Sequence, residues 1–430
     1  MPPSSPEDLA FANKVDAWVS GALADGKRTF GEVLCALPGV YPTEVLPSLR
    51  RITAAGGLRP SHLSAIERGA SRRHTPLCKG NGLGWLPLPH PLDFEWRFSA
   101  ETCETLLARA DGLSRRDWPV ALIGTPGLCA HLLEHGPIGR PFSFLGENNV
   151  VTGALRHRAL RGPAKISFLP CGAGSSLAGT ADAVIIDPPW YADYIRPLFR
   201  MAALVCRVGG HILVSLPSEG VRPSAWADRE RTLAFARRIG LRAVACEPRT
   251  LTYDTPFFEW NSLVAAGIRN LPLTWRRGDL LVFERMPAQV APPGKQWVAA
   301  GWEESVVKGV RFRARLVTAA PDRGAIAAGL YPIVDGGVLP SVSRRDPRRA
   351  SVDVWTSGNR VFRCGRPDLV HLACRRLLGE SPPDDRGKSR DAGEEAYVER
   401  IASDLSHVVA QELMELTAFG ALEIGYTRPR

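Results

Sequence analysis

The sequence lacks most of the short motifs that assign a chain to a function class. It contains no P-loop, no His-Glu-x-x-His and no Gly-x-Ser-x-Gly, which excludes three common enzyme signatures. Its nine cysteines form no Cys-x-x-Cys and no paired Cys/His spacing. That scatter argues against a zinc site and favours a reducing compartment, so we expect no bound metal.

Long apolar runs and internal repeats are missing as well. No run of about 18 apolar residues occurs, and the first residues form no basic and apolar leader. No repeat of about 20–50 residues is visible, which argues against a solenoid. We therefore expect a soluble, cytoplasmic protein with no membrane partner. A length of 430 residues with 45% hydrophobic content is enough for several domains.

Acidic residues are fewer than basic ones, and the formal net charge is +10. A basic balance favours polyanionic partners such as DNA or RNA. Of the 54 basic residues 47 are arginine, and such a bias can equally reflect a GC-rich genome. The charge is consistent with a nucleic-acid partner and does not establish one.

The most informative residues are Asp187-Pro188-Pro189-Trp190, which follow the apolar run 183–186 and therefore sit where a buried strand ends. The Asp187 carboxylate and the Pro188 carbonyl can accept hydrogen bonds from an amine, and the prolines stiffen the turn. Trp190, helped by Tyr191, offers a flat face on which a base can stack. The alternative is a proline-stiffened turn after a core strand.

This tetrad resembles the catalytic motif of S-adenosylmethionine-dependent amino-methyltransferases, and its tryptophan form resembles that of the adenine-N6 methyltransferases of DNA and RNA. The resemblance implies catalytic roles for Asp187, Pro188, Pro189 and Trp190. It implies methyl transfer from S-adenosylmethionine to an exocyclic amine. A base in a duplex would have to be flipped out to reach the site.

The surrounding sequence alternates short apolar runs with helix-like segments. This alternation predicts an α/β fold with a doubly wound, mostly parallel sheet. The resemblance implies that the fold is of the Rossmann-like, class I methyltransferase type. Ligands of such sheets bind at the carboxyl ends of the strands, where Gly124, Glu147 and Asp187 fall. The predicted strands are 118–123, 142–145, 165–169, 183–186, 210–216, 241–246 and 279–284.

The cofactor loop is expected at Gly124-Thr125-Pro126, where a glycine lets the backbone approach a ligand and a helix follows. Glu147, with Asn148 beside it, is placed to take the ribose hydroxyls. The loop departs from the common Gly-x-Gly of methyltransferases. In layout it is similar to the branch with the zinc-knuckle ribosomal-RNA adenosine-N6 methyltransferase and a related protein-lysine methyltransferase.

Phe257 and Phe258 belong to an aromatic-rich segment between two predicted strands. They are candidates for substrate binding, since aromatic rings can stack on a base. The alternative, a strand edge with its aromatic side chains in the core, is favoured slightly, and packing on the sheet explains the mixed segment 90–98.

The chain outside the sheet divides into smaller parts. Three short helices within residues 7–70 suggest a winged-helix module whose arginines (50, 51, 68, 72 and 73) meet phosphates, or else a packing or dimerisation unit. Farther along, the strand-like run 310–317 has one basic face, and 344–349 is arginine-rich. Either could contact a nucleic-acid backbone, although a charge run is more often a solvated loop.

Changes in composition set the expected boundaries of these parts. An apolar stripe at helical spacing in 397–416 indicates core or a partner contact, so a protein partner or a dimer is conceivable through this helix or the N-terminal module. The expected parts are a helical module at 1–72, a methyltransferase domain at 80–288, an α+β accessory domain at 295–378, a flexible linker at 379–395 and a C-terminal helix at 396–430.

We therefore predict an N-methyltransferase that uses S-adenosylmethionine as cofactor, with adenine N6 in DNA or RNA as the acceptor. Two alternatives stay open. A protein-lysine methyltransferase would use the same fold and the same amine chemistry. A non-catalytic nucleic-acid-binding or scaffold protein would explain the missing Gly-x-Gly.

Overall fold

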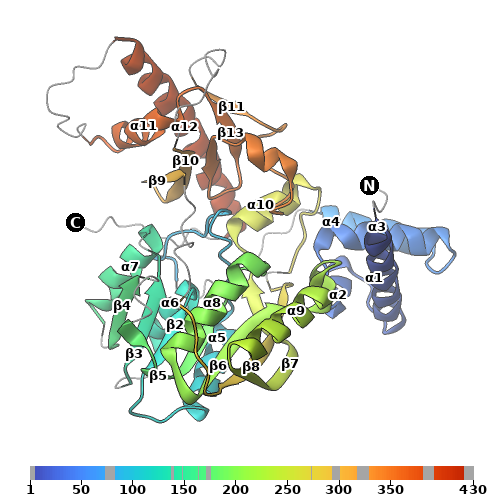
Figure 1. Ribbon diagram of the computed structural model, residues 1–430. Helices are drawn as coiled ribbons and strands as arrows, with labels where there is room; N and C mark the ends of the chain where they lie inside the picture. Colours follow the sequence, from blue (N-terminus) through green and yellow to red (C-terminus); the bar gives the residue numbers. More distant parts are fainter. Residues whose placement is uncertain are drawn as a thin grey trace.

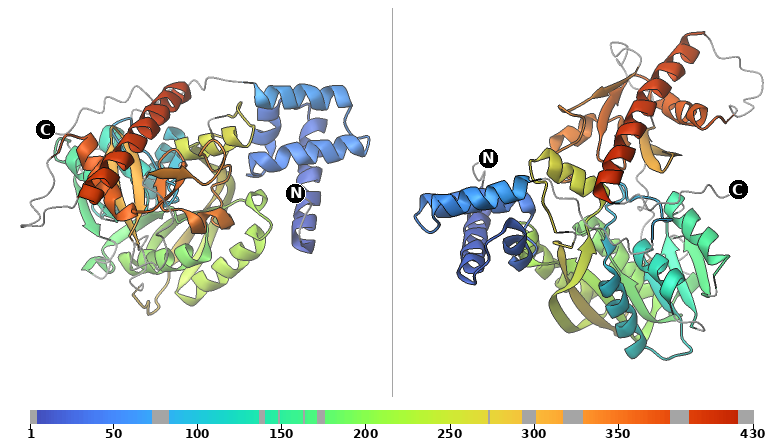
Figure 2. Two further views of the ribbon diagram at one scale, coloured as in Figure 1. Left: turned by 90° about the horizontal axis from the view of Figure 1, so that it is seen from above. Right: turned by 180° about the vertical axis from the view of Figure 1, so that it is seen from behind.

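The computed structural model divides the chain into three parts, which Figure 1 shows as a helical module, a central domain and an accessory domain. We use these names for residues 5–72, 83–292 and 301–420. Both views of Figure 2 agree that the helical module lies beside the central domain and that the accessory domain packs on another side. The structure describes residues 5–72, 83–136, 140–147, 149–162, 164–170, 176–272, 274–292, 301–316, 329–380 and 392–420.

An eight-stranded sheet with the order β1-β7-β8-β6-β5-β2-β3-β4 forms the central domain. Neighbours among β2 to β6 run parallel, whereas β8 is antiparallel to both β6 and β7. This sheet confirms the predicted α/β fold with a Rossmann-like, largely parallel sheet. The strands are β1 Arg97–Phe98, β2 Val120–Ile123, β3 Phe142–Gly146, β4 Ile166–Pro170, β5 Ala181–Ile186, β6 Cys206–Pro217, β7 Leu241–Asp254 and β8 Arg277–Arg285.

All seven runs that the apolar pattern predicts lie in strands, although the predicted run in β7 is largely exposed and β4 is only partly buried. Every residue of β2 and β5 is buried, as expected for parallel strands at the centre of a sheet. The pattern misses β1, which has two residues, and it misses the partly exposed polar ends of β6 and β7.

Helices cover both faces of this sheet and bury two separate apolar layers. Helices α5 to α7 pack on one face, and α8 and α9 pack on the other. Helix α10 precedes β8 and lies close to both flanking parts of the chain. The helices are α5 Ala100–Gly112, α6 Pro126–His135, α7 Val150–Ala159, α8 Ala192–Val205, α9 Ala225–Arg238 and α10 Phe257–Ala265.

The helical module has four helices where the sequence predicts three. Its described residues, 5–72, contain no strand, so the wing of a winged helix is not found among them. Its core continues into the central domain through Leu263 and Trp275. The helices are α1 Pro6–Ala24, α2 Phe30–Ala36, α3 Pro42–Ala54 and α4 Pro60–Ser71.

Two of the arginines expected to meet phosphates are engaged within the module. Arg50 pairs with Glu67 at 2.7 Å, and Arg51 pairs with Asp16 at 2.7 Å. Arg73 lies outside the described residues. These ion pairs favour the packing interpretation of the module over a phosphate-binding surface.

The accessory domain combines an antiparallel sheet, in the order β11-β13-β12-β10-β9, with two helices. The predicted apolar stripe of α12 packs on this sheet as core, and the helix begins at Ala392, inside the segment expected to be flexible. The rest of that segment, 381–391, lies outside the described residues. The elements are β9 Trp302–Val307, β10 Val310–Arg315, β11 Leu330–Pro332, β12 Val354–Thr356, β13 Val361–Cys364, α11 Val370–Leu377 and α12 Ala392–Phe419.

The predicted basic face of β10 is not a nucleic-acid surface. Arg311 is fully buried and Arg313 is only 8% exposed. Arg311 pairs with Asp93 at 2.6 Å and with Glu304 at 2.5 Å, so its charge is neutralised inside the protein. Alternating arginines on a strand read as exposed from sequence alone, because their acidic partners come from distant segments.

Candidate functional site

The three strand ends singled out in the sequence meet at one edge of the sheet. Strand β2 lies between β3 and β5, and Ile123 is in register with both Leu145 and Ile186. Gly124, Glu147 and Asp187 follow these strands and line one pocket of about 500 Å³. This is the topological switch point, where open α/β sheets bind ligands, and the volume suits a small-molecule ligand.

The carboxyl group of Asp187 accepts a hydrogen bond from a side chain of β7, which is itself hydrogen-bonded to a side chain of β6. The hydroxyl of Tyr253 on β7 donates to Asp187 Oδ1 at 2.8 Å, and the same hydroxyl shares a hydrogen bond with Ser215 on β6. Burial raises the pKa of Asp187 from 3.8 to about 7, and the Tyr253 hydrogen bond opposes that rise. The carboxyl group is therefore poised between its neutral and ionised forms near neutral pH.

The two prolines after Asp187 also line the pocket. The turn is tight, because the backbone N–H of Tyr191 donates to the Pro189 carbonyl at 2.6 Å. Within the described part of the chain, no group donates to the Pro188 carbonyl. It is free to accept a hydrogen bond from a ligand, as the sequence predicts.

Trp190 lines the pocket but is only 5% exposed. The guanidinium carbon of Arg276 lies 4.3 Å from the centre of the Trp190 ring, and Tyr253 meets this ring edge-on at 5.8 Å. One face of the indole is therefore occupied, and the open stacking face predicted for it is reduced. Tyr191 and Tyr194 are more accessible and line the same pocket, beside Phe94.

The two phenylalanines at the start of α10 take different places. Phe258 reaches the wall of the pocket. Phe257 instead packs against Trp260 and against Phe419 of α12, with ring centres 6.5 and 5.9 Å apart. The structure therefore does not bring Phe257 to the pocket, because α10 turns its side chain toward the accessory domain.

The predicted cofactor loop lies directly beside Asp187. Gly124 has φ +66°, a conformation that favours glycine, and a Cβ built there would be 3.8 Å from the Asp187 carbonyl oxygen. Pro126 lines the pocket at the first turn of α6. Thr125 is 3% exposed and its hydroxyl has no partner among the described residues, so its side chain turns into the core.

The second strand end supplies an acid, as predicted. Glu147 lines the pocket, and its pKa is raised to about 7 by burial and by the nearby charge of Asp93. Asn148 lies outside the described residues. Its neighbour Asn149, which the sequence does not single out, lines the pocket and caps α7 by accepting from the Thr152 N–H at 3.0 Å.

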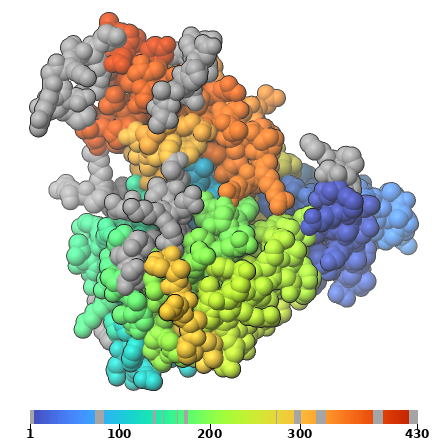
Figure 3. Space-filling view, in the orientation of Figure 1, coloured from blue at the N-terminus to red at the C-terminus, as the bar shows by residue number. Residues whose placement is uncertain are grey.

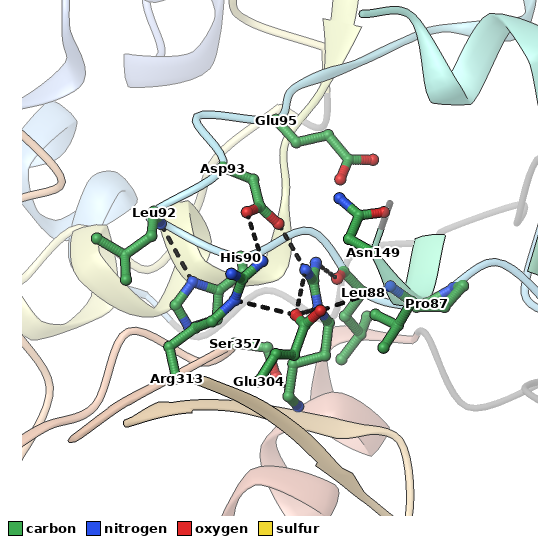
Figure 4. A network of polar contacts seen from close by, with 12 residues as sticks. Pro87, Leu88, His90, Leu92, Asp93, Glu95, Asn149, Glu304, Arg313 and Ser357 are labelled. Carbon is green, nitrogen blue, oxygen red and sulfur yellow. Dashed lines mark hydrogen bonds and ion pairs between the residues drawn. The ribbon is translucent and has the colours of Figure 1, made fainter. Parts of the chain in front are cut away.

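The segment 90–98, for which the sequence suggested packing on the sheet, contributes a wall of the pocket. Figure 4 shows Asp93 beside Arg313, with which it pairs at 2.9 Å, and Asp93 also pairs with Arg311 at 2.6 Å. His90, fully buried, is hydrogen-bonded to the Trp355 carbonyl at 3.2 Å. Burial and the nearby Arg311 charge lower the pKa of His90 well below its usual range. These contacts fix the segment to the accessory domain and present Phe94, whose φ is +53°, to the pocket.

The accessory domain also covers part of the pocket through residues 340–345. Arg344 pairs with Asp193 of α8 and lies over the Tyr194 ring at 5.5 Å. Arg349 lies over the Phe94 ring at 5.6 Å. The arginine-rich run is thus partly a contact with the central domain, and Figure 3 shows the two domains in contact.

The helical module reaches the pocket at the start of α3. Tyr41, Thr43 and Glu44 contribute to its lining, and the Tyr41 hydroxyl donates to the buried carboxyl of Glu259. All three parts of the chain therefore build one pocket. Sequence patterns gave no signal for this, because each flanking part contributes loop or helix-end residues without a motif.

The described residues lack both a metal-binding cluster and a membrane-spanning helix. No group of three or more His, Cys, Asp or Glu side chains there is arranged to hold a metal ion. No helix of the described ranges is long and apolar enough to cross a membrane.

No protein family and no curated protein matches the sequence. Among solved structures, the branched-chain polyamine synthase C9 mutein from Thermus thermophilus is 15% identical, with 66% of this chain and 90% of that chain covered and a TM-score of 0.48. A putative sarcosine dimethylglycine methyltransferase from Galdieria sulphuraria is 13% identical, with 44% and 85% covered and a TM-score of 0.31. Fibrillarin from Aeropyrum pernix is 12% identical, with 42% and 74% covered and a TM-score of 0.29. These likenesses concern the fold and leave the substrate open.

Proposed function

We propose that the protein transfers a methyl group from S-adenosylmethionine to an amine, and that the acceptor is the exocyclic N6 of adenine in DNA or RNA. One observation carries this proposal. The carboxyl group of Asp187 and the open carbonyl of Pro188 lie in the same pocket as the backbone of Gly124. Acceptors for an amine and a loop suited to a cofactor are therefore side by side.

The residues of this pocket fit the proposed cofactor. At Gly124 the backbone is bare toward the pocket, and the α6 N-terminus behind it favours a carboxylate such as that of the methionine moiety. Glu147, at the next strand end, can accept hydrogen bonds from the two ribose hydroxyls. When bound, S-adenosylmethionine supplies an electrophilic methyl group on a sulfonium.

The chain itself would orient the acceptor amine and take up its proton. Asp187 and the Pro188 carbonyl accept the two N–H bonds of the amine, which turns the nitrogen lone pair toward the donor. A nitrogen that gains a methyl group must lose a proton. The carboxylate of Asp187, whose pKa is about 7, can receive it near neutral pH.

The shape of the site supports an acceptor base that leaves its stack. Asp187 shares the pocket with the rings of Tyr191 and Phe258, and the accessory domain contributes residues 340–343 and Arg345 to its wall. A base inside a duplex cannot enter such a pocket without being flipped out, so single-stranded or flipped substrates are favoured.

A protein-lysine or other alkyl-amine acceptor is the second candidate. It is favoured by the acidic side chains of Glu44, Glu147 and Asp187 in the pocket, since these would attract a cationic amine. Amine chemistry at Asp187 is common to both candidates. The molecule that carries the amine distinguishes them.

A labelled-methyl assay tests the proposal. The purified protein is incubated with methyl-labelled S-adenosylmethionine and single-stranded DNA, RNA or a lysine-rich protein fraction, and each product is then digested with nuclease or protease. We expect label on nucleic acid, sensitive to nuclease and lost in Asp187→Asn. Label that resists nuclease and is released by protease would favour the second candidate. Full labelling by Asp187→Asn would contradict both.

A further inference from the structure

Arg276 occupies an unusual position in the wall of the pocket. Its guanidinium carbon lies 4.1 Å from the centre of the Trp96 ring and 4.3 Å from that of Trp190, so the group is stacked by both tryptophans. The side chain is half-buried and lines the pocket with Asp187. Stacking of this kind fixes the plane of the guanidinium and directs its N–H groups along that plane.

The guanidinium has no hydrogen-bond or ion-pair partner among the described residues. Its Nε is shielded from solvent without a partner, and no carboxylate of those residues lies within 4.0 Å of its nitrogens. The carboxylates of Glu259 and Asp187 are close enough to raise the pKa of Arg276. Even so, burial lowers the pKa of Arg276. No residue that the structure describes neutralises the positive charge of Arg276 by direct contact.

Each of the other buried arginines of the described chain has at least one hydrogen-bond or ion-pair partner, although the Nε atoms of Arg140, Arg313 and Arg360 also lack a hydrogen bond. Arg311 donates to Glu304 and to the Leu88 carbonyl, at 2.5 and 2.7 Å. Arg285 donates to the Ala203 carbonyl at 2.9 Å. Buried polar groups are normally paired. An unpaired arginine in a pocket therefore indicates that a bound ligand supplies its hydrogen-bond acceptor.

We propose that Arg276 binds an oxyanion of the acceptor molecule, and that this oxyanion is the phosphate of a nucleotide whose base amine reaches Asp187. The inference rests on the proposed amine methyl transfer and narrows its acceptor. Arginine presents parallel N–H donors that match a phosphate. The acceptor of this pocket is therefore an amine that carries negative charge, and polyamines or lysine side chains are disfavoured beside an unpaired cation.

Calorimetric titration with three probes tests the proposal: adenosine 5′-monophosphate, adenosine and inorganic phosphate. In the wild-type protein we expect the nucleotide to bind about 10- to 100-fold more tightly than adenosine, because one charge-assisted contact is worth that factor. Inorganic phosphate should compete with the nucleotide. Arg276→Gln should remove the preference, and Arg276→Lys, which keeps the charge without the planar fork, should retain part of it.

Arg315→Gln is the matched control. Arg315 stacks on Trp302 at 4.9 Å in the accessory domain and does not line the pocket. Its loss removes a similar Arg–Trp stack, so any general effect on folding should appear in both variants. Retention of the nucleotide preference by Arg315→Gln and its loss in Arg276→Gln would support the proposal. Thermal melts of all variants verify that each is folded.

Three outcomes would overturn the proposal. Arg276→Gln could keep the wild-type preference for the nucleotide, or the wild-type protein could show none. Acetate or glutamate could compete where phosphate does not, which would assign the arginine to a carboxylate. Failure of the methyl-transfer proposal is separable, because Asp187→Asn should lose labelling and still prefer the nucleotide.

Discussion

Replacing Asp187 by asparagine should stabilise the protein at neutral and alkaline pH while it abolishes methyl transfer. Asparagine has the same shape and keeps an oxygen that accepts from the Tyr253 hydroxyl, as Asp187 Oδ1 does at 2.8 Å. It removes only the need to ionise a carboxyl group in a pocket where burial disfavours charge. The effect on stability should therefore depend on pH.

The magnitude follows from the pKa of Asp187, which rises from 3.8 to about 7 on folding. Between these two values the folded state holds a proton that the unfolded state has released, so stability falls as the pH rises. The loss is complete above the folded-state pKa, where it reaches at most about 4 kcal/mol. Asp187 is only partly buried, so solvent screening reduces this figure.

Urea unfolding of wild type and Asp187→Asn at several pH values measures the effect. The variant should gain stability relative to wild type by about 2–3 kcal/mol between pH 5 and pH 8. Glu412→Gln is a control, because burial also raises the pKa of Glu412 to about 7 but this residue does not line the pocket. It should change the pH dependence of stability in the same direction and leave methyl transfer intact. A difference between wild type and Asp187→Asn that is independent of pH would refute the reasoning.

Three more predictions concern the residues around Asp187. Gly124→Ala places a side chain at φ +66°, which should lower stability by about 1–2 kcal/mol and weaken cofactor binding in a titration. Gly179→Ala, at φ +67°, is the control, because it should lower stability by as much and leave cofactor binding unchanged. Tyr253→Phe removes a hydrogen bond that lowers the pKa of Asp187, so the rise of methyl-transfer rate with pH should move to higher pH. Arg311→Met should lower the urea-unfolding free energy by about 3 kcal/mol, because Asp93 and Glu304 lose one of the two arginines that neutralise them and keep only Arg313, and a loss below about 1 kcal/mol would contradict this.

The sheet was predictable because its strands are continuous apolar runs that end at recognisable turn residues. Gly124, Glu147 and Asp187 were therefore placed at strand ends correctly, and the parallel order brought them together. The apolar pattern records burial directly, since both faces of β2 and β5 are covered. Local sequence was therefore sufficient to predict those strands whose place is decided by burial alone.

The rest of the pocket depends on contacts between distant segments. Arg276 lies beside Trp96, and Tyr253 reaches Asp187, through pairings that no local pattern encodes. The basic face of β10 was misassigned for the same reason, because the partners of Arg311 are 7 and 218 positions away. Tertiary ion pairs turn an apparently exposed charge into a buried one.

Composition suggested boundaries between parts of the chain, but it gave no sign that these parts build one pocket together. Residues 340–345 and the start of α3 line the pocket although each belongs to a flanking part. Neither segment carries a motif. From sequence alone, residues 340–345 look like an ordinary loop and the start of α3 looks like an ordinary helix N-terminus. Their contribution follows only from the way in which the domains pack.

The measurement that tests the account most directly is a calorimetric titration of the folded protein with S-adenosylmethionine and S-adenosylhomocysteine. Wild type and Gly179→Ala should bind both ligands, and Gly124→Ala should bind them at least about 10-fold more weakly, as expected for a loss of 1.4 kcal/mol. No binding of either ligand by the folded wild-type protein, or equal binding by Gly124→Ala, would contradict the claim that the loop beside Asp187 holds the methyl donor.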